Sequence, residues 1–532
     1  MPENGLPPLV QALLKPAAYP QPTRRVELIQ THISYVFLTD DYAYKIKKPV
    51  DFGFLNYSTL GKRRYYCQRE VALNSLLCDE TYLGVVPIRK LGNEYVIDGK
   101  KGETVEYAVW MRRLPEDRML NRLIERGEAT KRMVEQVADK LVPFHESTSE
   151  TSPAFARYGD WAIRYNHREN VEQWTPFVGK TLTPEQHAIC LAYAEAFFAR
   201  KRDVLARRVK ELRIRRTHAD LRSDAICMQD GVCIMDAVEF NRRISVLDIA
   251  RDVGFLEMDL AYRGRQDLAE AFVRRYQKSA HDPDLREVLP FYAYYSACVR
   301  GKVEAFLLNI PSVPAKAKKA AAEASHRYFE MACEYAKTLP PAMLVVMCGL
   351  SASGKSTAAK EIAPHLGATV ISSDVVRKKL AGMRPTTRAL DDFRAGLYSA
   401  EMTKKTYAAM LEQAHDLLMR GKSVILDATF QRAGERKAAA RLARETGAQF
   451  ALVEVTASDA AARKRLSTRL EKGRDPSDAR WEIYIKQKGR FQPPKEVTPD
   501  RHIMVHASAA AKKRGIVNAV ARLREISPLS VQ

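Results

Sequence analysis

Residues 349–356 have the composition of a loop that binds phosphate. Their sequence, GLSASGKS, fits G-x-x-x-x-G-K-[ST] and lies between an apolar run and a helical pattern. Glycines let backbone N–H groups converge on phosphate oxygens, and the following helix adds the positive end of its dipole. Lys355 would neutralise the β- and γ-phosphates, and Ser356 would coordinate Mg²⁺. The predicted nucleotide-binding residues are Gly349, Ser351, Ala352, Ser353, Gly354, Lys355, Ser356 and Thr357.

Two carboxylates follow further along the chain. Asp427 ends the apolar run VILD, where a carboxylate can hold a magnesium-bound water, so it is the second predicted metal residue of this part. Asp374 precedes Arg377 at helical spacing in ISSDVVRKKL. Its carboxylate could accept a hydroxyl proton while Arg377 clamps an anionic group. The alternative is a helix-capping Asp374 with a solvated Arg377.

Arginines recur in RKRLSTRLEKGRD, from Arg465 through Arg469 to Arg474. This spacing is typical of a lid over a transferring phosphoryl group, whose charge arginines stabilise. Arg469 is the predicted nucleotide contact, although each arginine taken alone could equally be a surface residue.

A second set of chemical residues lies in the segment from Arg215 to Asn241. His218, Asp220 and Asp236 occur in the order of a catalytic loop, with Asp220 as base and Asp236 as metal ligand. Between them, Asp230-Gly231 predicts a two-stranded turn. Ala225 stands where such a loop supplies an Asn to magnesium, and Ala has no oxygen ligand.

The strand pattern YAYKIKK would place Lys45 and Lys47 on one face. Lys45 could contact the α- and β-phosphates of a nucleotide, held by Glu70 from the next helix. The alternative is a solvated lysine in a charged run. Residues 105–120 would form the hinge against adenine.

The elements around these residues predict two domains. A long helical pattern at about 315–337 ends before Pro340-Pro341, so we expect domains at 1–338 and 339–532. The second alternates buried strands with helices, which predicts an α/β fold with a parallel sheet. The expected strands are AMLVVMC, ATVIS, SVILDAT, FALVEVTA and RHIMVHA. The first has short strands to about residue 110 and then mostly helices, which predicts an α+β fold.

The composition is that of a globular protein of 532 residues with a formal charge of +22, which favours anionic partners. No apolar run reaches the roughly 20 residues of a membrane span, and no secretory signal is visible. The eight cysteines show no disulfide framework and no zinc-ligand spacing. We expect a cytoplasmic protein that does not bind a membrane.

The motifs resemble two known families. GLSASGKST, ISSDVVRKKL, VILDATF and RLEKGRDPSDA resemble the AAA-33 or zeta-toxin-like P-loop kinases over about 343–530. HISYVFLTDDYAYKIKKPVDFGFL and DAVEFNRRISVLDIARDVGFLEMDL are similar to aminoglycoside-phosphotransferase-like proteins with a fused P-loop domain, over about 25–310. The first resemblance implies ATP-dependent transfer to a hydroxyl, with Asp374 facing the acceptor. The second implies a bilobal protein-kinase-like fold that uses ATP, with Asp220 and Asp236 as base and metal ligand.

The leading hypothesis is an ATP- and Mg²⁺-dependent phosphotransferase whose P-loop domain phosphorylates a small-molecule or nucleotide-like hydroxyl. The N-terminal domain would be a weak kinase or a ligand-sensing pseudokinase. One alternative is a regulatory switch that hydrolyses ATP, and another is a nucleic-acid end kinase, since nucleic acid is a possible partner. The sequence names neither the acceptor nor the oligomeric state.

Overall fold

The computed structural model divides into two compact units. They comprise Met1–Thr181 with Val204–Tyr335, and Leu182–Asp203 with Ala336–Gln532. The structure describes residues 6–53, 55–147, 153–311, 313–339, 342–384, 396–472, 480–506 and 512–526. The division near Tyr335 lies close to the predicted boundary, but residues 182–203 group with the second unit. Independent folding of 1–338 and 339–532 stays a prediction.

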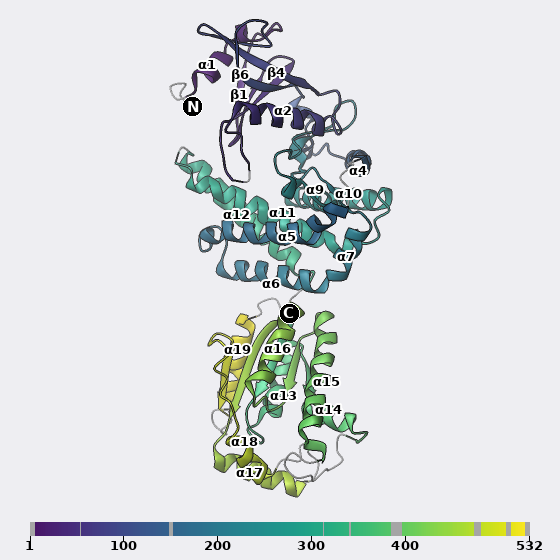
Figure 1. Cartoon of the computed structure of the whole chain (residues 1–532), viewed down its shortest axis with the longest axis vertical. Coiled ribbons are helices and arrows are strands. Elements are labelled where there is room, and N and C mark those ends of the chain that lie inside the picture. Colours follow the sequence, from purple (N-terminus) through teal and green to yellow (C-terminus); the bar gives the residue numbers. More distant parts are fainter. Residues whose placement is uncertain are drawn as a thin grey trace. The chain divides into compact units, whose positions relative to one another are not determined.

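The first unit begins with an antiparallel sheet in the order β1-β2-β3-β6-β4-β5 (Figure 1). The strands are β1 (Glu27–Gln30), β2 (Ser34–Leu38), β3 (Tyr42–Lys47), β4 (Tyr82–Leu91), β5 (Glu94–Ile97) and β6 (Glu103–Arg112). Helix α2 (Leu60–Asn74) packs on one face of the sheet through Cys67, and α1 (Pro8–Leu13) packs on the other. Thr59 caps α2 by accepting a hydrogen bond from Lys62 N.

Helices dominate the rest of this unit. They are α3 (Leu120–Glu125), α4 (Lys131–Ser147), α5 (Pro153–Trp174), α7 (Arg202–Lys210), α8 (Arg242–Ser245), α9 (Ala250–Tyr262), α10 (Gln266–Ser279), α11 (Leu285–Phe306) and α12 (Ala315–Ala336). A two-stranded sheet pairs β7 (Ile214–Arg216) with β10 (Val246–Asp248). The sheet-then-helix order agrees with the predicted α+β class, whereas a protein-kinase-like bilobal fold stays a prediction.

The predicted turn at Asp230-Gly231 joins two short antiparallel strands, β8 (Ile226–Cys227) and β9 (Cys233–Ile234). Asp230 and Gly231 both have positive φ, 51° and 128°. This conformation suits glycine and is tolerated by aspartate.

One disulfide joins Cys78, which follows α2, to Cys233 of β9. The scattered cysteine spacing predicted no disulfide, so this bond corrects the sequence interpretation. The two residues are 155 positions apart and meet only because the hairpin folds back onto the end of α2, with a Cα–Cα distance of 4.6 Å.

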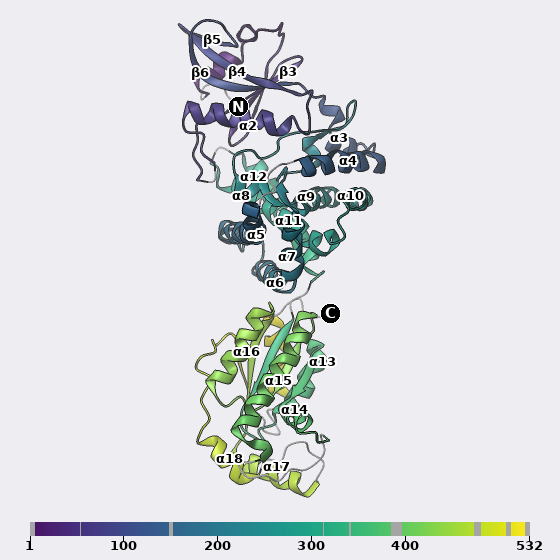
Figure 2. The ribbon, with the colours of Figure 1, turned by 45° about the vertical axis from the view of Figure 1, so that its right-hand side comes forward.

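The second unit contains a five-stranded parallel sheet in the order β12-β13-β11-β14-β15. Figure 2 shows this sheet with helices around it. The strands are β11 (Met343–Cys348), β12 (Thr369–Ser372), β13 (Val424–Asp427), β14 (Gln449–Thr456) and β15 (His502–His506). All five strands predicted from the sequence are present. The helices are α6 (Pro184–Arg200), α13 (Lys355–Leu366), α14 (Ser373–Leu380), α15 (Ala400–Met419), α16 (Ala433–Glu445), α17 (Asp459–Lys472), α18 (Trp481–Lys488) and α19 (Lys512–Ile526).

Two apolar layers cover this sheet. On β11, Met343 and Val345 face a core that includes α13 and α19. Leu344 and Val346 face the opposite core, which includes α15 and α16. A strand buried on both faces is continuously apolar, as MLVVMC is. Among the described residues, none of the helices is both long and apolar enough to cross a bilayer.

Candidate active site

The P-loop connects the carboxyl end of β11 to α13, as the motif requires. Gly349 has φ 133°, and a Cβ at this position would lie 2.3 Å from Val455 O, so only glycine fits between the loop and β14. Gly354 has φ 107° and is the residue before α13 begins. The N-terminus of α13 therefore opens onto the loop, where backbone N–H groups favour an anion.

Lys355 is the first residue of α13 and is buried, with 7% of its surface exposed. Its Nζ donates a hydrogen bond of 2.7 Å to Leu350 O, within the loop. The Ser353 hydroxyl is buried and has no hydrogen-bond partner among the described residues. A buried donor of this kind fits a phosphate oxygen as its partner.

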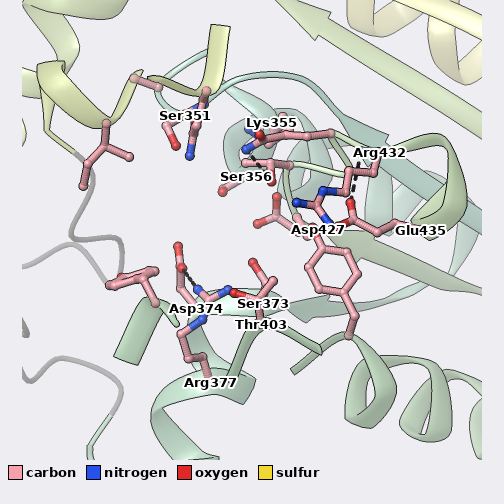
Figure 3. Close-up of a pocket in the computed structure, with 18 of the residues that line it drawn as sticks. Ser351, Lys355, Ser356, Ser373, Asp374, Arg377, Thr403, Asp427, Arg432 and Glu435 are labelled. Atoms are coloured by element: carbon pink, nitrogen blue, oxygen red, sulfur yellow. Dashed lines mark hydrogen bonds and ion pairs between the residues drawn. The ribbon is translucent and has the colours of Figure 1, made fainter. Parts of the chain in front are cut away.

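A cavity of about 230 Å³ joins the P-loop to the predicted acceptor residues. Figure 3 shows Lys355, Ser356 and Asp427 on one side of it, with Asp374 and Arg377 on the other. These five residues come from three different segments of the second unit. The structure therefore brings the predicted phosphate, metal and acceptor residues into one pocket.

Asp374 lies in the first turn of α14, one residue after Ser373, which begins the helix. Its Oδ1 accepts a hydrogen bond of 3.0 Å from Arg377 Nη1. Asp374 is not the N-cap, because that position belongs to Ser372. The alternative of a capping Asp374 with a solvated Arg377 is therefore wrong. Arg377 is 7% exposed and its guanidinium lies 4.7 Å from the ring centre of Tyr398.

Ser356 and Asp427 fit a magnesium ion, because both offer oxygen donors beside Lys355. Asp427 ends β13 and pairs in register with Met347 of β11, so its carboxylate lies at the edge of the sheet from which the P-loop leaves. Within the described residues, no group of three or more His, Cys, Asp and Glu side chains could hold a metal. Mg²⁺ bound through one or two protein oxygens, water and nucleotide phosphates needs no such cage.

Several residues of the pocket were missed by the sequence interpretation. They are Ser373, Tyr398, Ala400, Thr403, Tyr407, Ala428, Thr429, Gln431, Arg432, Glu435, Ile483, Gln487 and Arg490. Arg432 and Glu435 flank the start of α16, where Glu435 Oε2 accepts a hydrogen bond of 3.2 Å from Arg432 N. Burial raises the pKa of Glu435. Their spacing soon after Asp427 could have marked them, since residues after a strand's carboxyl end meet at the same edge of the sheet.

The predicted arginine lid is only partly described. Arg465 Nη1 donates to Ala352 O and Ser353 O, at 3.1 and 2.9 Å, so this arginine holds the backbone of the P-loop. Arg465 therefore lies beside the phosphate loop, and a lid of arginines over the transferring group stays a prediction. The Arg469 side chain and all of Arg474 lie outside the described residues. Gln487 of α18 also contacts the loop by accepting a hydrogen bond from Ser351 N.

In the first unit, Lys45 lies between two carboxylates. Its Nζ is 2.8 Å from Glu70 Oε1 and 2.7 Å from Asp236 Oδ1. Burial alone would lower the pKa of Lys45, but Asp236 and Glu70 hold it well above its ordinary value. The structure thus shows the predicted Lys45–Glu70 pair. It also pairs Lys45 with Asp236, the predicted metal ligand.

Lys47 points to the same side of β3 as Lys45, as the strand alternation predicted. It contacts Glu70 Oε2 at 2.6 Å and Glu239 Oε1 at 2.5 Å, and it is 2% exposed. The sequence interpretation missed Glu239, which follows the hairpin in DAVEFN. Because Glu70 forms ion pairs with both lysines, this one carboxylate holds both strand residues.

In the loop that carries Asp220, Arg222 forms ion pairs with two aspartates. Arg222 Nη1 lies 2.7 Å from Asp224 Oδ2, and Arg222 Nε lies 3.5 Å from Asp220 Oδ2. Despite the burial of Arg222, Asp220 and Asp224 raise its pKa. Ala225 is buried and supplies no oxygen. The loop therefore holds Asp220 beside a guanidinium group.

Backbone contacts hold this loop in place. Asp252 accepts hydrogen bonds from His218 N and Ala219 N, at 2.5 and 2.8 Å, and contacts His145 Nε2 at 3.0 Å. Ala219 has φ 70°. Although burial alone would raise it, the pKa of Asp252 is lowered by His145, by His218 and by the N–H of Ala219. Asp252 therefore fixes the backbone of the loop before Asp220, a role that the sequence motif did not predict.

The parallel sheet and its phosphate loop define the second unit as a P-loop domain. Residues 344–494 match the family model AAA_33, described as an AAA domain. This match confirms the predicted AAA-33 resemblance. The resemblance of the first unit to aminoglycoside phosphotransferases stays a prediction.

Two curated relatives are the uncharacterized proteins Rv2004c of Mycobacterium tuberculosis (strain H37Rv) and Mb2027c of Mycobacterium bovis. Each is 30% identical over 434 residues, covering 81% of this chain and 84% of the relative. The chain belongs to the same family as these mycobacterial proteins. A match of 434 residues is longer than either predicted domain, so it extends over both.

Among solved structures, about a third of this chain is similar to each of two kinases. A gluconokinase from Sinorhizobium meliloti 1021 is 20% identical, covers 35% of this chain and 95% of its own, and has a TM-score of 0.25. The Mycobacterium tuberculosis APS kinase CysC, in complex with AMPPNP and APS, is 20% identical, with coverages of 35% and 99% and a TM-score of 0.27.

Proposed function

We propose that the second unit transfers the γ-phosphoryl group of ATP to a hydroxyl of a small-molecule or nucleotide-like acceptor. One observation carries this proposal. The pocket that contains Lys355 and Ser356 of the P-loop is also lined by the Asp374–Arg377 pair. A nucleotide switch that only hydrolyses ATP needs no such pair opposite its P-loop.

The residues divide the reaction between them. Lys355 and the backbone of the P-loop bind and neutralise the phosphates, and Asp374 accepts the proton of the attacking hydroxyl. The acceptor oxygen forms a bond to the γ-phosphorus while the bond to the β,γ-bridging oxygen breaks, which releases ADP. Arg377 orients Asp374 and offers its remaining N–H groups to an anionic part of the acceptor. Ser356 and Asp427 would hold Mg²⁺, which supplies positive charge to the phosphates.

The test is a transfer assay with γ-labelled ATP and pools of metabolites and oligonucleotides. A labelled product that requires both Lys355 and Asp374 supports the proposal. Release of inorganic phosphate alone, at an unchanged rate in Asp374→Asn, would favour the ATP-hydrolysing switch. A labelled oligonucleotide whose formation falls steeply with salt would favour a nucleic-acid end kinase.

We propose a ligand-sensing role for the first unit, in preference to phosphoryl transfer. The supporting observation is the cation that faces each acidic group, Arg222 beside Asp220 and Asp224, and Lys45 beside Asp236. Lys45 competes with a metal ion for Asp236, the predicted metal ligand, and Ala225 removes an oxygen ligand, so the first unit offers few ligands to the metal that phosphoryl transfer needs. ATP binding to the first unit without phosphate transfer would support sensing, whereas transfer that depends on Asp220 would overturn it.

A further inference from the structure

A group of basic side chains in the first unit belongs to neither site above. We call Arg243 of α8, Arg251 of α9 and Lys302 of α11 the basic cluster. Helix α5 faces it with Glu169 and Asn170. These helices thus bring three cationic side chains to one region of the first unit. Burial of a charge without a partner costs free energy.

Arg251 is the innermost member and is 2% exposed. Its Nη2 donates a hydrogen bond of 2.9 Å to Ala219 O, directly before Asp220. Its guanidinium lies 4.8 Å from the ring centre of Phe255 and 5.2 Å from that of Tyr295. Its Nε and Nη1 have no hydrogen-bond partner among the described residues. The two rings attract the positive charge but leave these buried N–H groups unsatisfied.

Lys302 is bound by neutral acceptors. Its Nζ donates to Asn170 Oδ1 at 2.5 Å and to Gln173 Oε1 at 2.7 Å. Burial lowers the pKa of Lys302 to about 8, and the charges of Arg243 and Arg251 act in the same direction. Glu169 acts on this pKa in the opposite direction, so Lys302 is repelled by the two arginines and attracted by one carboxylate.

Glu169 is the carboxylate that contacts this cluster. Both of its oxygens lie 3.0 Å from Arg243 Nη2, and Arg243 also donates to Asn166 Oδ1. The Glu169 side chain is 31% exposed and that of Arg243 is 18% exposed, so the outer edge of the cluster reaches solvent. Within the part of the chain that the structure describes, Glu169 pairs with Arg243 and acts on Lys302 through its charge, while the buried Arg251 retains unsatisfied donors.

We propose that the basic cluster binds an oxyanion, the phosphate or carboxylate group of a small metabolite. Charge-assisted hydrogen bonds from Arg251 and Lys302 would satisfy the buried donors and offset the repulsion among the cations. Glu169 competes with such a ligand for the same positive charge. Because Arg251 also holds Ala219 O, the bound anion would lie behind the loop that carries Asp220.

The probe is inorganic phosphate, with acetate in a parallel titration to represent a carboxylate. Binding is measured by calorimetry on the full chain. Every sample carries Lys355→Ala, which weakens phosphate binding at the P-loop. Lys302→Met keeps the length of the side chain and removes its charge, and Glu169→Gln removes the competing carboxylate. The matched control is Arg168→Met, which changes an exposed arginine on the same helix, α5.

We expect Lys302→Met to weaken binding of phosphate, acetate or both by about tenfold or more. Glu169→Gln should tighten the same binding, and Arg168→Met should leave it unchanged. The opposite effects of the two cluster variants separate a binding site from a general loss of folding. Binding that is the same in Lys302→Met as in its parent, or that is not tightened by Glu169→Gln, would overturn the proposal.

Discussion

Asp374 and Arg377 form an ion pair of 3.0 Å in the pocket that also holds the P-loop lysine. The pair lies on one turn of α14, which leaves the carboxyl end of β12. A carboxylate held in this way is oriented before any acceptor arrives, which reduces the entropic cost of proton transfer. The N–H groups of Arg377 that Asp374 does not engage remain available to an anionic part of the acceptor.

We expect Lys355→Ala to reduce ATP turnover by the whole protein about 10²–10³-fold. The lysine charge acts on the phosphates as negative charge develops during transfer. Turnover is measured with γ-labelled ATP, and circular dichroism confirms folding. Lys360→Ala, on the same helix but outside the pocket, is the control. Turnover near the wild-type rate in folded Lys355→Ala would mean that the first unit is the main enzyme.

Asp374→Asn should retain ATP affinity and lose transfer to the acceptor by about 10²–10⁴-fold. The amide keeps the shape of the carboxylate but cannot accept the hydroxyl proton. Nucleotide affinity and product formation are measured on the same samples, with the exposed Asp416→Asn of α15 as control. A parallel fall of both quantities would assign Asp374 to the fold or to the metal site.

Ala225→Asn should make ATP binding to the first unit more dependent on Mg²⁺. The new amide oxygen would lie in the loop that carries Asp220, and Ala225→Leu is a control of similar size without that oxygen. Because residues 182–203 group with the second unit, the full chain with Lys355→Ala is preferable to a truncated first unit. Adding Arg222→Gln should increase the effect, since it removes the cation beside Asp220 and Asp224. An unchanged response to Mg²⁺ in both variants would show that this loop is not an eroded metal site.

Glu257→Gln should change how stability depends on pH. Burial raises the pKa of Glu257 from 4.5 to about 7, and Tyr335 donates a hydrogen bond of 2.8 Å to it. The folded state therefore holds its proton more tightly, so stability falls as pH rises from about 4.5 to 7, by roughly 2–3 kcal/mol. Urea unfolding at pH 5 and pH 8 measures this loss, which should shrink in Glu257→Gln. An equal loss in variant and wild type would exclude Glu257 as its source.

The Cys78–Cys233 disulfide is testable by thiol counting. In denaturant without reductant, six of the eight cysteines should react with a thiol reagent, and seven should react in Cys233→Ser. Eight reactive cysteines in the wild-type protein would mean that the purified chain is reduced.

The sequence by itself determined the parallel sheet and the phosphate loop of the second unit. Continuous apolar runs such as MLVVMC are typical of strands in a parallel sheet that helices cover on both faces. The P-loop is a local motif, in which residues adjacent in the sequence form the binding site. Lys355, Ser356 and Asp427 could be assigned for that reason. The Lys45–Glu70 pair was also predictable, since strand alternation and a following helix brought the two side chains together.

Only the tertiary structure decided which distant residues complete each site. Arg432 and Glu435 enter the P-loop pocket because their segment follows the carboxyl end of β13, whereas Gln487 enters it from α18, which no pattern near the P-loop records. Arg465 was predicted only as one of a group of lid arginines, and the fold shows which atoms it contacts, the carbonyls of the P-loop. Arg222 beside Asp220 and the cations around Arg251 likewise depend on contacts between separate segments. Charge in a sequence gives the number of ions, whereas the fold determines which of them face one another.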